Sequence, residues 1–260
     1  MIGGDGLYWE TKTKAGRVLE IYKAYTKRTG KAKGNGSRER TKEEMDKCNF
    51  HNAVKKLTRL MNANFQDGDL HLVLTYPRGN KPTPADAMRL FTNWREAVRR
   101  VFKKAGIAFK WISVVEYQGK NIHHHVLINN PDEINIVKMV QEKWKHGIVK
   151  VTPLYSNRQG RDYRELAEYF VKETDKTFRE KDGGMSQRWS ASKNLEKPKV
   201  TTKRVKARKW KKEPKIPAGY HLIQDTLVNG TDPWGRDYQK YTLIEVDNVH
   251  NSRKKERKKE

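Results

Sequence analysis

The order of apolar runs in the middle of the chain constrains the fold more than any other feature. Residues 70–76 (LHLVLTY) form a short apolar and β-branched run stopped by Pro77, which predicts a buried strand. Residues 107–117 and 122–129 are also strand-like, and the four residues QGKN between them predict an antiparallel hairpin. Another short strand is expected in GIVKVTPL, which begins at Gly147.

Helical periodicity fills the intervals between these strands. Thr83 can cap a helix with Pro84 at its first position, and apolar residues then recur at three-to-four spacing until Gly106. A second helix is expected over residues 133–145. The resulting order, β-α-β-β-α-β, predicts an α+β fold of the ferredoxin-like, split βαβ type. In this arrangement a central antiparallel sheet carries helices on one face and leaves the other face open for a ligand.

Two further helices and two basic regions flank this core. Thr41 with Glu44 forms a capping-box signature before a helix that we expect to fray in its middle, and another helix should run from Asp162 to about Lys176. We therefore divide the chain into a basic N-terminal arm, a catalytic domain and a basic C-terminal extension that holds a small β element and a charged tail. Their expected bounds are residues 1–40, 41–180 and 181–260.

Charge points to a polyanionic partner. The 56 Lys and Arg exceed the 31 Asp and Glu by 25, and the excess gathers in runs. Residues 11–40 carry ten Lys or Arg against two Glu, which predicts a loose arm, and residues 193–215 carry eleven against two. Each run alone could be a solvated face, but three such runs around one apolar core, counting the tail SRKKERKKE, favour nucleic acid.

Composition also excludes several classes of protein. The single cysteine, Cys48, cannot form an intramolecular disulfide or a cysteine-based zinc site. No stretch approaches the length of an apolar membrane span, and the start of the chain lacks the order of a signal peptide. We expect a cytoplasmic, DNA-associated protein with no membrane partner.

The His triplet at 123–125 is the most informative segment for chemistry. Strand alternation puts His123 and His125 on one face and His124 on the other. Glu116, in an otherwise apolar strand across the hairpin, can join that face, where a carboxylate is costly unless it is paired or coordinated. Two imidazoles and a carboxylate predict a divalent metal site with open positions. A salt bridge from Glu116 to a Lys or Arg is the alternative.

The later helix offers a nucleophile. Tyr169 and Lys172 are three residues apart on one side of it, and a phenol beside a cation can act on phosphate once deprotonated. Alternatively Tyr169 extends the apolar stripe and Lys172 pairs with Glu168. Tyr163 lies on a different face of the helix and is a poorer candidate.

Taken in order, a strand ending LVLTY, His-x-His in a central hairpin and Tyr-x-x-Lys on a later helix resemble the HUH endonuclease superfamily. The closest resemblance is to rolling-circle replication initiators of phages and plasmids, in particular those related to the filamentous-phage gene II protein. It spans roughly residues 60–200. The middle residue of the triplet is His124 rather than an aliphatic residue, and only one tyrosine occupies the motif helix.

This resemblance implies a ferredoxin-like palm that nicks single-stranded origin DNA by transesterification. Tyr169 would attack the phosphate and become joined to the 5′ end, which frees a 3′-OH primer. Glu116, His123 and His125 would hold Mg or Mn, and Lys172 would compensate charge on the phosphotyrosine.

Basic and aromatic side chains after the palm suit the tracking of single-stranded DNA. The candidates for DNA contact are Trp189, Lys193, Lys199, Lys203, Arg204, Arg208 and Trp210. The alternative is that this segment is a solvated tail whose tryptophans fold back and pack on the palm. Because no G-x-x-x-x-G-K-[ST] motif occurs in the sequence, a host helicase would have to unwind the duplex, and a host DNA polymerase would extend the primer.

Other functions share parts of this pattern. A mobilisation relaxase or a single-tyrosine transposase would use the same site residues. A non-catalytic RNA-binding module would share the β-α-β-β-α-β order, although a His triplet stands where such a module carries aromatic residues. A metal hydrolase that uses water would leave Tyr169 without a catalytic role.

Overall fold

The computed structural model describes residues 7–26, 41–77, 79, 81–118, 121–155, 162–179, 187–232 and 235–246. These residues form four helices: α1 (Lys42–Asn64), α2 (Pro84–Lys104), α3 (Ile136–Lys143) and α4 (Arg164–Arg179). They also form ten strands: β1 (Tyr8–Ala15), β2 (Val18–Ala24), β3 (Leu70–Leu74), β4 (Trp111–Gln118), β5 (Asn121–Ile128), β6 (Val149–Pro153), β7 (Ser190–Ala191), β8 (Lys199–Val205), β9 (Tyr220–Thr231) and β10 (Asp237–Glu245).

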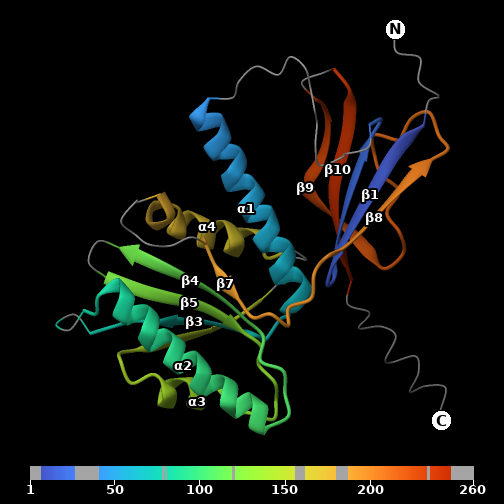
Figure 1. The fold of residues 1–260 in the computed structure, drawn as a ribbon. Helices are drawn as coiled ribbons and strands as arrows, with labels where there is room; N and C mark the ends of the chain where they lie inside the picture. The colour runs from blue at the N-terminus through green and yellow to red at the C-terminus, as the bar shows by residue number, and fades with distance from the viewer. Residues whose placement is uncertain are drawn as a thin grey trace, which may run out of the picture. The chain divides into compact units, whose positions relative to one another are not determined.

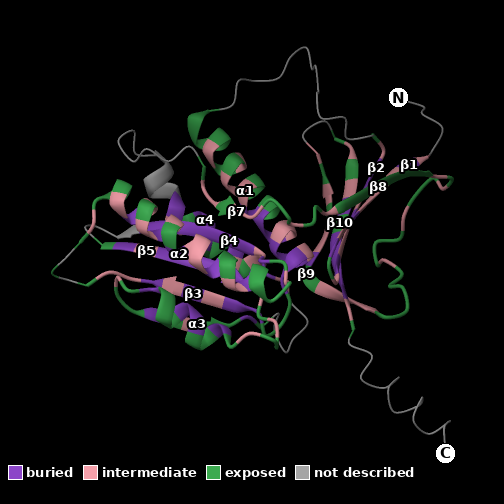
Figure 2. Ribbon diagram, turned by 60° about the horizontal axis from the view of Figure 1, so that its bottom comes forward, coloured by how far each residue is buried: buried purple, intermediate pink, exposed green. Residues whose placement is uncertain are grey.

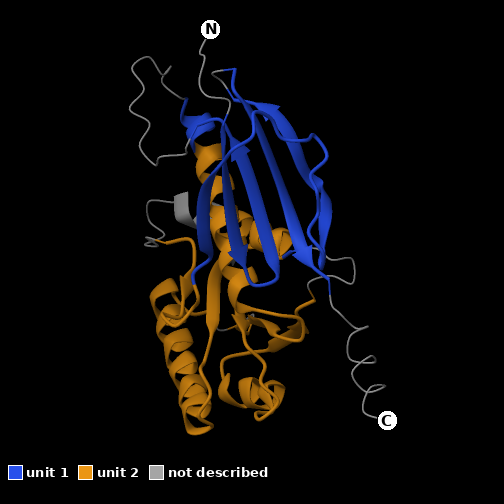
Figure 3. Cartoon of the chain, turned by 90° about the vertical axis from the view of Figure 1, so that its right-hand side faces the viewer, with its two compact units in different colours: residues 1–45, 157–162, 197–260 blue, residues 46–156, 163–196 orange. Residues whose placement is uncertain are grey.

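The chain divides into two compact units, which Figure 3 shows in two colours. The first unit comprises residues 1–45, 157–162 and 197–260, and the second comprises residues 46–156 and 163–196. Each unit is built around its own five-stranded antiparallel sheet.

The sheet of the second unit has the strand order β6-β3-β5-β4-β7. Every neighbouring pair in it is antiparallel. Without the short edge strand β7, this is the split βαβ order. Strands β3 and β4, which α2 connects, are separated by β5, and strands β5 and β6, which α3 connects, are separated by β3. The ferredoxin-like prediction is therefore confirmed for this unit. Figure 2 shows buried residues along much of β4 and β5, as expected for central strands.

Helices α2 and α3 cover one face of this sheet (Figure 1). The Thr83 side chain accepts a hydrogen bond from the Asp86 amide, and Pro84 occupies the first turn, as the sequence predicted. Phe91, Trp94 and other apolar residues of α2 then pack against the apolar side of β3 and β5. Burial of this stripe orients α2 against the sheet.

The opposite face of the sheet is not left open, contrary to the sequence-based expectation. Val54, Leu57 and Met61 of α1 pack with Phe170 and other residues of α4 over the central strands (Figure 1). Helix α1 is continuous rather than frayed in its middle. On this same face His123 is only partly covered, and Lys150 and Thr152 of the edge strand β6 are exposed.

The N-terminal region is a correction to the prediction of a loose basic arm. Residues 8–24 form β1 and β2, which occupy inner positions of the first unit's sheet, in the order β8-β1-β2-β10-β9. The three lysines of these strands, Lys12, Lys14 and Lys23, project from one face of the sheet, where Lys12 and Lys14 are partly buried and Lys23 is buried. Residues 27–40 lie outside the described part of the chain, as does the charged tail after residue 246.

The C-terminal extension is also more ordered than its composition indicated. Residues 199–205 form β8, and β9 with β10 completes the same sheet. The Gln239 amide donates to the carbonyls of Lys211 and Lys212, and the Tyr25 hydroxyl donates to the carbonyl of Arg208. These bonds fasten the basic segment 206–217 across one face of the sheet.

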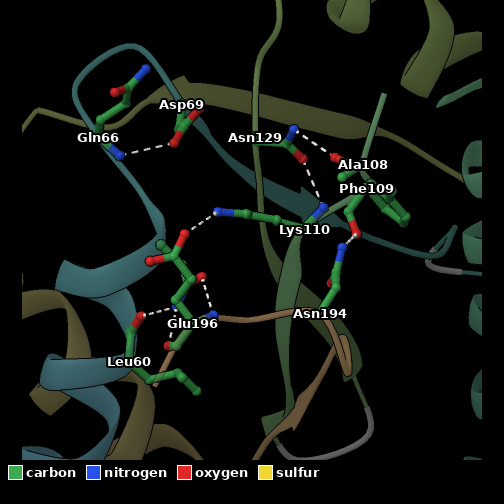
Figure 4. Close-up of polar contacts among 10 residues, drawn as sticks. Leu60, Gln66, Asp69, Ala108, Phe109, Lys110, Asn129, Asn194 and Glu196 are labelled. Atoms are coloured by element: carbon green, nitrogen blue, oxygen red, sulfur yellow. Dashed lines mark hydrogen bonds and ion pairs between the residues drawn. The ribbon is translucent and has the colours of Figure 1, made fainter. Parts of the chain in front are cut away.

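The segment that leads from β7 towards the first unit is fastened to the palm by side-chain amides (Figure 4). Asn194 donates to the Phe109 carbonyl, and the Asn64 side chain bonds both the amide and the carbonyl of Glu196. Lys110 forms an ion pair with Glu196 at 3.8 Å. The path of residues 194–196 is thus set by side-chain amides that bond backbone groups, together with one ion pair.

No helix in the described ranges is long and apolar enough to cross a membrane.

Candidate active site

The hairpin of β4 and β5 sets the positions of the metal-ligand candidates. Glu116 on β4 lies directly opposite His123 on β5, so both side chains are on the same face as His125. His124 points to the other face, where its ring stacks on Phe91 with the centroids 4.7 Å apart. The alternation that the sequence predicts is the alternation observed.

Glu116 and His125 are joined directly. His125 Nε2 lies 2.7 Å from Glu116 Oε2, and both side chains are buried. Burial lowers the pKa of His125, which keeps its imidazole neutral. Burial alone would raise the pKa of Glu116, but the hydrogen bond from His125 holds it below its ordinary value. The pair is thus a neutral imidazole that donates to a carboxylate.

His123 lies at the edge of this pair. Its Nδ1 is 3.8 Å from Glu116 Oε2, and its side chain is 30 % exposed. It is therefore the most accessible of the three candidate ligands.

His71 is a member of the site that the sequence reasoning missed. Its Nε2 lies 3.1 Å from His125 Nδ1, and its ring stacks against the His125 ring. Burial, followed by the nearby His125 and Lys150, lowers the pKa of His71 to about 4. Because His125 donates from Nε2 to Glu116, its Nδ1 accepts a hydrogen bond from Nε2 of His71. The three side chains thus form one chain of hydrogen bonds. The only sequence signal was a polar residue at an alternate position of the apolar run LHLVL.

Helix α4 brings Tyr169 to the same face. The Tyr169 ring is edge-on to the His125 ring at 5.6 Å, while the neighbouring Phe170 is fully buried against His71 and His125. Because Phe170 anchors the helix, Tyr169 is held at the margin of the core and stays 40 % exposed. Lys172 is exposed one turn further along the helix.

Two carboxylates influence the phenol. Burial, followed by the negative charges of Glu116 and Glu173, raises the pKa of Tyr169. Glu173 is a second residue that sequence reasoning did not assign, although its position four residues after Tyr169 places it on the same helix face. At neutral pH the phenol is protonated and needs a proton acceptor and a nearby positive charge before it can attack.

The donor set fits a divalent cation. Glu116 Oε1 is buried without a hydrogen-bond partner within the described ranges, and the Glu173 side chain lies beside this carboxylate. A buried carboxylate oxygen beside the imidazoles of His123 and His125 is a suitable environment for Mg or Mn. Among the described residues, however, no three His, Cys, Asp or Glu side chains are already arranged around one point. The assignment of Glu116, His123 and His125 as metal ligands therefore stays a prediction.

The predicted DNA-contacting residues fall in both units. Trp189 packs partly buried against the apolar cluster of α1 and α4, with Lys56 over its ring, and Lys193 is exposed nearby in the sequence. Lys199, Lys203 and Arg204 are exposed on β8.

Arg208 and Trp210 belong to the fastened segment 206–217. Arg208 is exposed, whereas the Trp210 ring contacts the rings of Tyr8 and Tyr25 at 5.1 and 4.9 Å. Trp210 thus serves the packing of the first unit and not of the palm, whereas Trp189 packs on the palm as the alternative predicted.

Comparison with known proteins relates the palm to one family. Residues 69–178 match the family model for the replication-associated proteins known as ORF2 or gene II protein. This match supports a replication-associated protein of the rolling-circle type. Curated proteins gave no match.

Among solved structures, the chain is similar to the hypothetical protein ORF119 from Sulfolobus islandicus rod-shaped virus 1. The two are 15% identical, the likeness covers 51% of this chain and 98% of that chain, and the TM-score is 0.32. Likeness at that score carries no argument about function.

Proposed function

We propose, from the relation of residues 69–178 to the replication-associated proteins of the gene II type, that this protein nicks single-stranded origin DNA and starts rolling-circle replication. The observation that carries the proposal is the meeting of Tyr169 from α4 with His125 and Glu116 from the central hairpin. A half-exposed phenol beside a buried imidazole–carboxylate pair is a suitable arrangement for nucleophilic attack on a phosphodiester.

The reaction is a transesterification. The Tyr169 oxygen attacks the scissile phosphorus, the bond from phosphorus to the 3′ oxygen breaks, and the 5′ phosphate becomes joined to the phenol. The leaving 3′ oxygen takes up a proton and becomes a 3′-OH, which can prime a host polymerase. The number of phosphodiester bonds is conserved, so no energy source is needed and the step is reversible.

The protein must promote loss of the phenolic proton. Glu116 and Glu173 both disfavour a phenolate at Tyr169, so the surrounding charge has to change when DNA is bound. A divalent cation held by Glu116, His123 and His125 would supply positive charge at the phosphate oxygens. Nε2 of His125 can act as a metal ligand only in the tautomer that carries the proton on Nδ1. In that tautomer Nδ1 donates a hydrogen bond to Nε2 of His71.

Lys172 has a supporting role in this proposal. It is exposed three residues after Tyr169, on the side of α4 that the helical repeat assigns to Tyr169. A positive charge there can offset the charge of the phosphotyrosine without contributing to the core.

The test is detection of a covalent adduct. Purified protein is incubated with single-stranded circular DNA from a candidate replicon and Mn or Mg, and the products are analysed on a denaturing gel and by mass spectrometry. We expect an adduct at Tyr169 and its loss in Tyr169→Phe, because this change removes one oxygen and little packing. Tyr155→Phe, which alters another exposed tyrosine, should form the adduct normally.

Other outcomes would contradict the proposal. Cleavage by Tyr169→Phe would exclude the phenol as the nucleophile and favour attack by water. Binding without cleavage, on DNA that contains the correct origin, would favour a binding module without catalysis.

A further inference from the structure

One face of the sheet in the first unit presents aromatic and basic side chains in two adjacent rows. In the first row Ala24 of β2 pairs with Trp9 of β1 on one side and Tyr238 of β10 on the other. Arg204 of β8 pairs with Trp9 and extends this row to the next strand. Directly paired residues in antiparallel strands project from the same face, so Arg204, Trp9 and Tyr238 share one surface.

The second row lies two residues away on the same face. Tyr22 of β2 pairs with Thr11 of β1 and with Lys240 of β10, and Thr202 of β8 pairs with Thr11. Arg204, Lys240 and Thr202 are exposed, and the three aromatic side chains are half-buried. We call the set Trp9, Tyr22, Arg204, Tyr238 and Lys240 the aromatic–basic face.

Two of the aromatic rings on this face pack against each other. Tyr22 and Tyr238 stack with their centroids 6.0 Å apart and their planes at 26°. A methyl group at Gly230, opposite Tyr238, would lie 2.7 Å from the Tyr238 hydroxyl, so only glycine leaves room for the ring in this position. Ala24, on the other side of Tyr238, is similarly small.

Charge in these two rows is of one sign. Their paired residues include Arg204 and Lys240 but no Asp or Glu, and Glu20 enters only in the next row, beyond Tyr22. On the opposite face, by contrast, Lys14 pairs with Glu245 and Lys203 with Glu10, and segment 206–217 is fastened across Gln239. The aromatic–basic face therefore combines aromatic rings with positive charge that no carboxylate within the two rows offsets.

We propose that the aromatic–basic face binds single-stranded DNA that flanks the nick site. Bases stack on Trp9, Tyr22 and Tyr238, and their phosphates contact Arg204 and Lys240. This combination fits single strands because every base has a stackable surface, whereas the bases of a duplex are already stacked on each other. The inference rests on the proposed function for its source of DNA, but the binding itself requires neither metal nor cleavage.

The test measures binding alone. Full-length protein is titrated into fluorescent thymidine oligonucleotides of about 20 nucleotides, without divalent metal, and anisotropy is recorded over a range of salt concentrations. We expect the double variant Tyr22→Leu/Tyr238→Leu to bind roughly tenfold or more weakly, with an unchanged slope of log affinity against log salt. Tyr155→Leu, which removes an exposed tyrosine of the second unit, should bind as the unaltered protein does.

Variants of the basic residues provide an independent measurement. Arg204→Ala alters an exposed side chain and leaves the sheet intact, and it should flatten the salt slope by about 0.7, the value for one lost phosphate contact on a single strand. Lys240→Ala should act in the same way.

Three results would overturn the inference. They are unchanged binding by the folded tyrosine double variant, an unchanged salt slope in Arg204→Ala, and an equal loss of affinity for duplex and single-stranded DNA. Failure of the proposed nicking reaction would be a separate result, because it would appear as a missing Tyr169 adduct while binding to thymidine oligonucleotides remained sensitive to Tyr22 and Tyr238.

Discussion

Three consecutive histidines on β5 occupy three different environments. His123 is partly exposed beside Glu116, His124 is fully buried between the sheet and α2, and His125 is buried between Glu116 and His71. The His124 Nε2 lies 2.9 Å from the hydroxyl of Tyr76, and its Nδ1 has no partner within the described part of the chain. One residue type thus serves core packing on one face and chemistry on the other, because neighbouring strand residues alternate.

The buried histidines make stability depend on pH. Burial is the largest cause that lowers the pKa of His71 to about 4 and that of His124 to about 3, against 6.5 for an ordinary histidine. The unfolded chain therefore binds protons below pH 6.5 that the folded chain does not, and the free energy of unfolding falls as pH falls towards 4. Between pH 7 and pH 5 each histidine should account for about 2 kcal/mol of this loss.

We expect His124→Phe to remove one of these contributions. Urea unfolding at pH 7 and pH 5 should show a pH-dependent loss that is smaller by about 2 kcal/mol, alongside a cost at pH 7 of about 1 kcal/mol for the lost bond to Tyr76. His51→Gln, at an exposed position of α1, serves as the control and should leave the pH dependence as it is. A pH dependence that is the same in His124→Phe as in the unaltered chain would show that His124 does not stay neutral.

His71 should matter to metal affinity through His125. In His71→Phe the ring packing on Phe170 is retained and the hydrogen bond to His125 Nδ1 is lost, so Mn affinity measured by calorimetry should fall by roughly 10- to 100-fold. His71→Gln, which can still accept a hydrogen bond, should recover part of the loss. Equal Mn affinity of the Phe variant and the unaltered protein would exclude a positioning role for His71.

At the scale of elements, the junction between α3 and β6 depends on a close backbone approach. Gly147 has φ +151°, and a methyl group there would lie 2.1 Å from the carbonyl oxygen of Thr75. Thr75 also exchanges hydrogen bonds with Ile148, which continues the pairing of β3 and β6 beyond the strands themselves. The register of the edge strand β6 is thus supported by Ile148, the residue just before the strand.

Gly147→Ala should therefore be costly. Because backbone atoms must move to relieve the clash, we expect a loss of about 3 kcal/mol or more in the free energy of unfolding, measured by urea titration. Gly106→Ala is a matched control, since Gly106 also has positive φ (+72°) but nothing within 4 Å of the added methyl group. It should cost about 1 kcal/mol. Similar losses in the two variants would refute the close-approach argument.

At the scale of the whole molecule, the first unit is assembled from both ends of the chain. Strands β1 and β2 lie between β8 and β10 in its sheet. The N-terminal pair therefore connects β8 to the C-terminal pair β9 and β10. The register pairs Tyr8 with Val205 and Val18 with Ile244, across nearly the whole length of the sequence. The palm, by contrast, is formed from one nearly continuous stretch.

Deletion of residues 1–26 should unfold the first unit and leave the second unit folded. Without β1 and β2, β8 loses its partner, and β9 and β10 remain as a two-stranded hairpin, which is marginally stable in water. Hydrogen exchange should show lost amide protection in β8, β9 and β10, with protection retained in β3, β4 and β5. Retained protection in β10 would show that the C-terminal strands fold without the N-terminal pair.

The sequence by itself determined the palm and the alternation of its chemical residues. The strands β3 to β6 and the caps at Thr41 and Thr83 follow from local apolar spacing and side-chain-to-backbone bonds, which involve residues close together along the chain. The opposition of Glu116 and His123 follows in the same way from a short hairpin.

Three features became evident only from the tertiary structure. They are the sheet of the first unit, the covering of the palm by α1 and α4, and the presence of His71 and Glu173 at the site. The strands of the first unit pair over about two hundred residues, and their lysine-rich alternation resembles a solvated arm until the partner strands are known. His71 reaches His125 only because β3 and β5 are neighbours in the sheet. Contacts between distant segments depend on the folded arrangement, and no local pattern in one sequence contains that information.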